Sequence, residues 1–136
     1  MTSHFSMDSA GFFAALVLTL AGLSGCESKP CSDSCERSGR CSPRGDECVA
    51  TKAEYCAASR DCADYGRCSL GDKGCVTKSD EDCQRSNKCK LAGECGFAGG
   101  RCTARSESDC RASAFCADRG MCRLKNKRDG RAICIK

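Results

Sequence analysis

Cysteines recur along this chain at nearly regular intervals, and this rhythm limits the possible folds more than any other feature. From Cys56 onward, successive cysteines are separated by 5, 5, 6 and 7 residues, then by the same series again, and finally by 5, 5 and 11. These intervals define a period of 27 residues. They predict four tandem units, at residues 31–48, 56–75, 83–102 and 110–134; the first is trimmed and the last has an expanded terminal loop.

Apolar side chains are too scarce to hold such a chain together by burial alone. The 136 residues include 17 cysteines, and cysteine above about 8–10 % of a short chain is typical of a secreted disulfide scaffold. Ordering the backbone costs about 1–2 kcal/mol per residue, which a composition this poor in aliphatic residues cannot offset. We therefore expect disulfides and an oxidising compartment. After Cys26 the chain holds only nine Leu, Ile, Val or Phe residues: Val49, Leu70, Val76, Leu91, Phe97, Phe115, Leu124, Ile133 and Ile135.

Serine and glycine follow the same period as the cysteines. Three segments, Thr51-x-x-Glu54, Ser79-x-x-Asp82 and Ser106-x-x-Asp109, resemble helix capping boxes, and a glycine two residues before each third cysteine suits a helix end. Together they predict one short helix per unit, over about 52–65, 80–92 and 107–119, then a turn and a small hairpin. The expected fold class is a small disulfide-rich protein of four tandem repeats of about 27 residues, each a helix plus a hairpin or loop. The recurring residues are Ser34, Ser59, Ser86, Ser113 and Gly39, Gly66, Gly93, Gly120.

Helix geometry restricts which cysteines can pair. The first two cysteines of a full unit are six residues apart, so on one helix they would rise about 9 Å, beyond the roughly 7 Å at which a disulfide closes. This leaves first to third with second to fourth, or first to fourth with second to third. Cys31 and Cys35, only four residues apart, escape this argument, and bridges between units remain open. The candidates are Cys31, Cys35, Cys41, Cys48, Cys56, Cys62, Cys68, Cys75, Cys83, Cys89, Cys95, Cys102, Cys110, Cys116, Cys122 and Cys134.

Cys26 falls outside the rhythm and follows an apolar run. Residues 10–23 carry no charge, and as a helix they would span about 21 Å, short of the roughly 30 Å hydrocarbon core of a membrane. This length favours a signal peptide over a membrane-spanning helix. Without Cys26, sixteen cysteines remain, the even number that a fully paired framework requires. An uncleaved anchor and an ordinary secretory signal are the alternatives.

The tetrapeptide Leu23-Ser24-Gly25-Cys26 at the end of this run resembles the lipobox of bacterial lipoproteins. The resemblance implies a signal peptide over 1–25, cleavage between Gly25 and Cys26, and a diacylglycerol with palmitate-like chains on the Cys26 thiol. Residues 26–30 would then be a lipidated tether. Several acyl chains hold a protein on a bilayer far more durably than one. The first nine residues depart from the pattern, because they contain no Lys or Arg and carry Asp8.

Few residues are suited to catalysis or to metal binding. The chain has no C-x-C or C-x-x-C pair, and its one histidine, His4, lies in the segment expected to be removed. A mature chain without histidine lacks the usual general base, so we predict a non-enzyme with no catalytic residue, no metal and no cofactor beyond the covalent lipid. The acidic residues of the predicted helices, Asp61, Asp64, Glu81 and Asp82, are expected on exposed turns.

The expanded last loop is the strongest candidate for binding. Residues 123–133 concentrate basic side chains against a single acid, Asp129, which suits anionic polysaccharide, lipid headgroups or nucleic acid. Aromatic residues that could stack on bases are few, so sequence-specific nucleic-acid binding is disfavoured. A plain solvated loop is the simpler alternative. The candidate anion-binding residues are Arg123, Lys125, Lys127, Arg128 and Arg131.

These observations predict an envelope-anchored, non-enzymatic structural or binding module for a protein or an anionic glycan, facing the periplasm or the cell surface. Glu27, where some lipoproteins carry an Asp that retains them in the inner membrane, implies the outer membrane. Arg44-Gly45-Asp46 resembles the integrin-binding loops of disintegrins, with an ordinary turn as the alternative. The other function class is a serine-protease inhibitor that presents Arg44, Lys73 or Arg101 on a disulfide-bounded loop.

Overall fold

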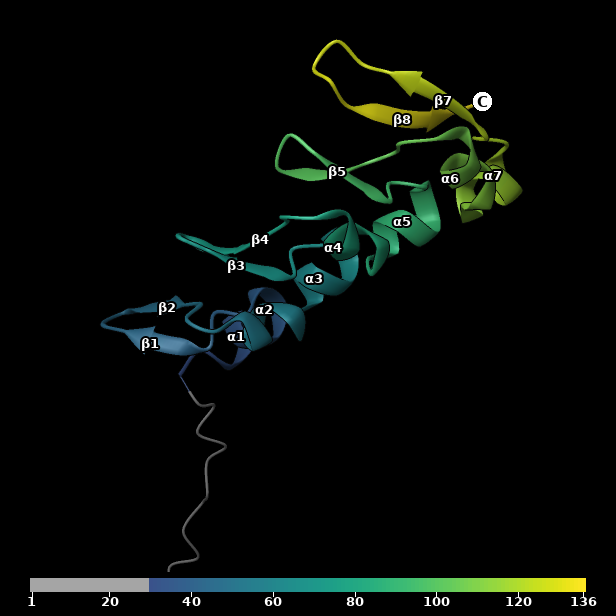
Figure 1. The fold of residues 1–136 in the computed structure, drawn as a ribbon. Helices are drawn as coiled ribbons and strands as arrows, with labels where there is room; N and C mark the ends of the chain where they lie inside the picture. Colours follow the sequence, from purple (N-terminus) through teal and green to yellow (C-terminus); the bar gives the residue numbers. More distant parts are fainter. Residues whose placement is uncertain (1–29) are drawn as a thin grey trace, which may run out of the picture.

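The computed structural model describes residues 30–136, in which short helices form a row along one side and hairpins project along the other (Figure 1). The helices are α1 (Ser32–Ser38), α2 (Ala53–Ala57), α3 (Arg60–Tyr65), α4 (Asp80–Gln84), α5 (Asn87–Ala92), α6 (Glu107–Ala112) and α7 (Ala114–Arg119). Helix α1 and the C-terminus lie at opposite ends of this row. The strands are β1 (Ser42–Arg44), β2 (Glu47–Val49), β3 (Ser69–Gly71), β4 (Gly74–Val76), β5 (Gly96–Ala98), β6 (Arg101–Thr103), β7 (Arg123–Asn126) and β8 (Ala132–Ile135).

Each strand pairs only with its neighbour in sequence, so the sheets are separate antiparallel hairpins. Two-residue turns close the first three, since Arg44 pairs with Glu47, Gly71 with Gly74 and Ala98 with Arg101. The expected small hairpins are confirmed. The last three hairpins, β3–β4, β5–β6 and β7–β8, pack on α2, α4 and α6, respectively. The helices α1, α3, α5 and α7 contact one another in succession.

Eight disulfides join the sixteen cysteines of the described residues. In the order of the predicted units, the first cysteine bonds the fourth and the second bonds the third, which decides between the two pairings that the sequence left open. No bridge within residues 30–136 joins two predicted units. The pairs are Cys31–Cys48, Cys35–Cys41, Cys56–Cys75, Cys62–Cys68, Cys83–Cys102, Cys89–Cys95, Cys110–Cys134 and Cys116–Cys122.

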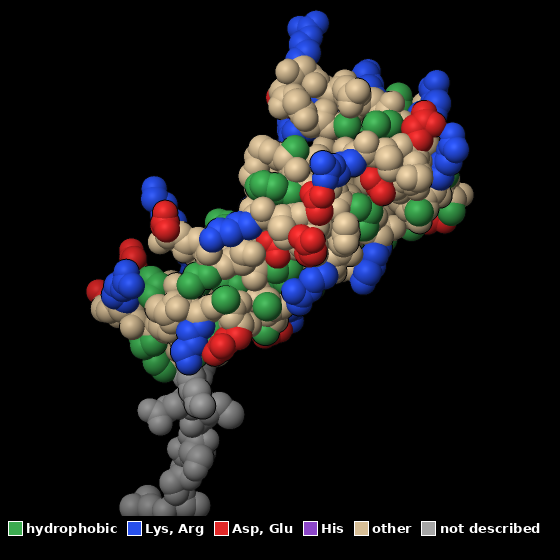
Figure 2. All heavy atoms as spheres, in the orientation of Figure 1, with side chains coloured by type: hydrophobic (Ala, Val, Ile, Leu, Met, Phe, Trp, Pro, Cys, Tyr) green, Lys and Arg blue, Asp and Glu red, His purple; other side chains and the backbone are tan. Residues whose placement is uncertain are grey.

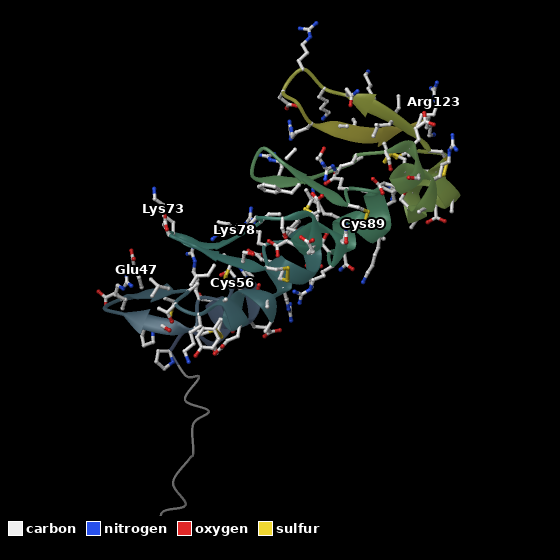
Figure 3. All side chains as sticks on the ribbon, viewed as in Figure 1. Glu47, Cys56, Lys73, Lys78, Cys89 and Arg123 are labelled. Carbon is white, nitrogen blue, oxygen red and sulfur yellow. A yellow bond between two sulfur atoms is a disulfide. The ribbon has the colours of Figure 1, made fainter. Side chains whose placement is uncertain are left out.

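Sulfur occupies the interior that aliphatic side chains fill in most proteins. Cys56, Cys83 and Cys110 are completely buried, and the other buried apolar residues of the described chain are cysteines and two alanines. None of the nine Leu, Ile, Val and Phe residues counted above is buried in this part of the structure. Figure 3 shows the disulfides between the helices and the hairpins. The expectation that cross-links replace a hydrophobic core is therefore met by the distribution of burial.

The single helices expected over 52–65, 80–92 and 107–119 are wrong, because each is broken near its middle. At the first break the Ser59 hydroxyl donates to the carbonyl of Cys56 (2.8 Å) and accepts the backbone N–H of Cys62 (3.2 Å). Ser59 has extended φ and ψ angles of −78° and 157°, so it caps a new helix. Ser86 and Ser113 make the same two bonds at their breaks. The first two cysteines of each pair of helices consequently lie on different helices.

The three predicted capping boxes have three different outcomes. Ser106 and Asp109 form the full reciprocal box, with both side-chain-to-backbone distances at 3.1 Å. Ser79 accepts the N–H of Asp82 at 3.3 Å, but the carboxylate of Asp82 bonds elsewhere. The Thr51 box is wrong, because α2 begins without any side-chain cap.

The expectation that Asp82 is exposed is wrong, because only 7 % of its surface is accessible to solvent. Its carboxylate accepts the Ser69 hydroxyl at 2.9 Å and the backbone N–H of Lys78 at 2.8 Å. These bonds tie the start of α4 to β3, and they compensate the burial of the charge. Asp61 is half-buried, whereas Glu81 and Asp64 are exposed as expected.

Glycine ends α1, α3, α5 and α7 in the left-handed conformation, as predicted. A Cβ on Gly66 would lie 2.7 Å from the sulfur of Cys102 and 2.9 Å from the carbonyl oxygen of Asp82, both in the segment that packs next. A Cβ on Gly39 or Gly93 would likewise lie 2.7 Å from a backbone carbonyl oxygen of the segment that follows in sequence. At Gly120, no atom of the described residues lies within 4 Å of such a Cβ. The recurring glycine thus permits close stacking along the row.

Candidate functional site

The tips of the first three hairpins are exposed. Gly45 and Asp46 form the first tip, Asp72 and Lys73 the second, and two glycines the third. Disulfides anchor the base of each hairpin, so residues at the tip carry no packing role and are free to meet a partner. The last hairpin differs, because residues 127–131 form a longer tip between β7 and β8.

We call residues 123–136 the basic hairpin. Its register pairs Leu124 with Cys134, and both lie against the small core cluster that includes Cys110. Because successive strand residues point to opposite faces, Arg123 and Lys125 project outward and are exposed. Packing of one face therefore fixes the direction in which the strand presents its cations.

Two of the five predicted anion-binding residues have partners inside the hairpin. The guanidinium of Arg131 donates to Asp129 from Nε at 2.7 Å and again from Nη2. This hydrogen bond lowers the pKa of Asp129 and raises the pKa of Arg131. Arg123 donates from Nε to the backbone oxygen of Lys136 at 3.0 Å. Neither contact is predicted by the sequence pattern.

The other three, Lys125, Lys127 and Arg128, are exposed and make no ion pair with any described residue. The side chains of residues 30–104 include 12 Lys or Arg and 12 Asp or Glu, whereas residues 105–136 include nine and four. All of the net positive charge of the described chain therefore belongs to its last segment. Figure 2 shows Lys and Arg side chains around this end of the molecule.

The residues proposed for protease inhibition lie on three different hairpins. Arg44 ends β1, Lys73 lies within a two-residue turn, and Arg101 begins β6; all three are exposed. A substrate-like inhibitor offers an extended segment to the protease, and a two-residue turn does not supply one around Lys73. Arg44-Gly45-Asp46 runs from the strand into the turn, an arrangement that an ordinary hairpin also produces. Both ideas stay predictions.

No metal site or membrane-spanning helix is found within residues 30–136. No three or more His, Cys, Asp or Glu side chains gather there as metal ligands, and the sixteen cysteines there are all in disulfides. The helices of this part are all too short and polar to cross a bilayer. The predicted cleavage site, Gly25 and Cys26, and the predicted lipid lie outside the described residues.

No family model, curated protein or solved structure matches this chain. Function is consequently inferred from the chemistry of its own residues. Of the predicted site residues, the structure brings the five cations of the basic hairpin together and leaves three of them unpaired. It spreads Arg44, Lys73 and Arg101 over separate hairpins.

Proposed function

We propose that this chain is a non-enzymatic binding module, held on a bacterial envelope by a lipid at Cys26, that presents its basic hairpin to an anionic glycan. The observation that carries the proposal is the partition of charge. Residues 30–104 have equal numbers of acidic and basic side chains, and the net charge of +5 on residues 105–136 lies at the end of the row opposite α1 (Figure 1). A tether at residues 26–30 would hold the neutral end near the membrane and direct the basic end away from it.

We also infer that residues 31–134 are four tandem units of one design. The shared pairing of cysteines, the capping serines and the close-packed glycines support this inference. Stacked units of this kind make extended, quasi-one-dimensional arrays whose length sets the reach of a terminal site. In this proposal the first three units set the distance between the membrane and the basic hairpin of the last one.

An anionic polysaccharide suits the basic hairpin better than a base-reading partner does. Lys125, Lys127 and Arg128 are exposed cations that make no ion pair with any described residue, so they can contact a polymer of repeating anions. Binding of this type weakens as salt rises, because exposed charges are screened within about 10 Å at 0.1 M ionic strength. An acidic protein surface would meet the same charges, and the test below separates the two partners.

The test measures binding of the full-length, oxidised chain, kept in a non-ionic polyoxyethylene detergent, to heparin as a model anionic glycan. Replacing Lys125, Lys127 and Arg128 together by Ala should weaken binding at least tenfold. The control replaces Arg37, Arg85 and Lys90 by Ala, three cations of the balanced segment that make no ion pair in the described structure. Binding that survives the first change, or that falls equally with the second, would contradict the proposal. Polyglutamate that binds as tightly as heparin would favour an acidic protein partner.

A further inference from the structure

A cleft lies between the first two hairpins, far along the row from the basic hairpin. It has a volume of about 260 Å³ and is lined by residues of β2 and its flanks and by the tip of the β3–β4 hairpin. Three of its lining side chains are cationic, Arg40, Arg44 and Lys73, and two are acidic, Glu47 and Asp72. Figure 3 labels Glu47 and Lys73 on these neighbouring hairpins. We propose that this cleft binds one acidic sugar unit, whose carboxylate is held by Arg40 and Arg44.

Arg40 is free for a ligand because the position that would neutralise it is a serine. Arg67, which also directly precedes a third cysteine, pairs with Asp61 six residues earlier at 3.4 Å. The residue six before Arg40 is Ser34, which offers no charge. No acid of the described residues lies within ion-pair distance of Arg40 or Arg44. Two unpaired guanidinium groups at one cleft favour an anion that both can bind.

The guanidinium of Arg40 lies beside the second hairpin. A Cβ on Gly74 would lie 3.9 Å from both Nε and Nη2 of Arg40, so the guanidinium reaches from the end of α1 across to the start of β4. Gly74 has no side chain to cover that group. Arg40 is exposed and lines the cleft, so its N–H fork can bind a carboxylate there in a bidentate manner.

The two acids of the cleft narrow the ligand class. Glu47 and Asp72 make no ion pair with any described residue, so their oxygens can accept hydrogen bonds from hydroxyl groups. A simple anion would use the cations alone and be repelled by these carboxylates. A sugar acid supplies one carboxylate and several hydroxyls. The cleft volume lies just below the roughly 300–1,000 Å³ of sites for drug-sized ligands, which suits a single monosaccharide unit.

The experiment titrates the oxidised full-length chain, in the same detergent, with tetragalacturonate and follows backbone amide shifts by NMR. We expect saturable shifts in residues 40–50 and 72–74. Arg40→Gln should weaken this binding at least tenfold, whereas Arg67→Gln, the matched and already paired cation, should change it less than twofold. The fully methyl-esterified tetramer, which keeps the hydroxyls and loses the charge, should not bind at these residues.

Three results would overturn the inference: no saturable shift in residues 40–50 and 72–74, equal loss in the two variants, or inorganic phosphate binding there as tightly as the sugar acid. The last result would show that the cleft recognises negative charge alone and not the hydroxyl groups of a sugar. The inference does not rest on the proposed function of the basic hairpin. The triple Ala variant of Lys125, Lys127 and Arg128 should keep the shifts in the cleft, so failure at one site is distinguishable from failure at the other.

Discussion

At the scale of single residues, close stacking of successive segments requires glycine at positions where a side chain would overlap the next segment. Gly66 and Gly120 have nearly the same left-handed backbone, with φ of 73° and 71°. Only Gly66 faces a neighbour, whose sulfur and carbonyl atoms leave no room for a Cβ. Substitutions at Gly66 and Gly120 therefore distinguish the free-energy cost of a left-handed backbone from the cost of steric overlap with a neighbour.

We expect Gly66→Ala to destabilise the fold more than Gly120→Ala. Both changes cost about 1 kcal/mol for the left-handed conformation, and overpacking at Gly66 adds about 1–3 kcal/mol. Guanidinium unfolding of the full-length chain with its disulfides intact measures the difference. Equal losses of unfolding free energy would show that Gly66 is not a packing contact.

The buried carboxylate of Asp82 supports a second prediction at this scale. Asp82→Ala leaves the Ser69 hydroxyl and the Lys78 N–H without their acceptor, which should cost about 1–3 kcal/mol of unfolding free energy. Its exposed neighbour provides the control, because Glu81→Ala should change stability by less than about 0.5 kcal/mol. The account of α4 docking would fail if the two variants were equally stable.

At the scale of elements, the sequence patterns anticipated the parts that depend on spacing and missed those that depend on competing hydrogen bonds. The serine and glycine pattern predicted the hairpins, and the glycines marked the helix ends correctly. The pairing was narrowed to two schemes that include the observed one, but on the premise of a single helix per unit, which the structure contradicts. The breaks at Ser59, Ser86 and Ser113 were missed, because a serine inside a helical pattern gives no sign that its hydroxyl will take the backbone bonds of a new helix.

The candidate sites were likewise predicted from the sequence only in part. Composition located the basic hairpin, but the pairing of Arg131 with Asp129, two residues away, depends on the shape of the tip. The unpaired state of Arg40 could have been inferred from Ser34, which stands at the position where the next predicted unit has Asp61. The cleft beside it could not, since it requires two hairpins to be placed side by side.

The pair within the basic hairpin gives an element-scale prediction. Because Arg131 lowers the pKa of Asp129, the contact is complete above the ordinary Asp pKa of 3.8 and is lost as pH falls through the lowered value. Asp129→Asn should free Arg131 at neutral pH and strengthen heparin binding several-fold. Asp46→Asn makes the same charge change at the exposed tip of the first hairpin, outside the lining of the cleft, and should leave heparin affinity within twofold. Equal effects of both variants would indicate that net charge, not the hairpin, governs binding.

At the scale of the whole molecule, sulfur replaces the aliphatic core. The eight disulfides close loops of 6 to 24 residues within successive segments, and for a loop of about 15 residues such a bridge contributes about 3 kcal/mol. Between segments, contacts of α1, α3, α5 and α7 hold the row together without a covalent link. Local covalent closure thus explains how a chain with so few large apolar residues is ordered.

The most direct test of this account is the intact mass of the chain purified from its native membranes, alkylated before and after reduction. We predict no alkylation without reduction, sixteen alkylated cysteines after it, and a remaining added mass of acyl chains on a chain that begins at Cys26. Several alkylatable thiols in the unreduced protein, or an unmodified Cys26, would contradict the central claim that disulfides define the fold and that the one remaining cysteine carries the lipid.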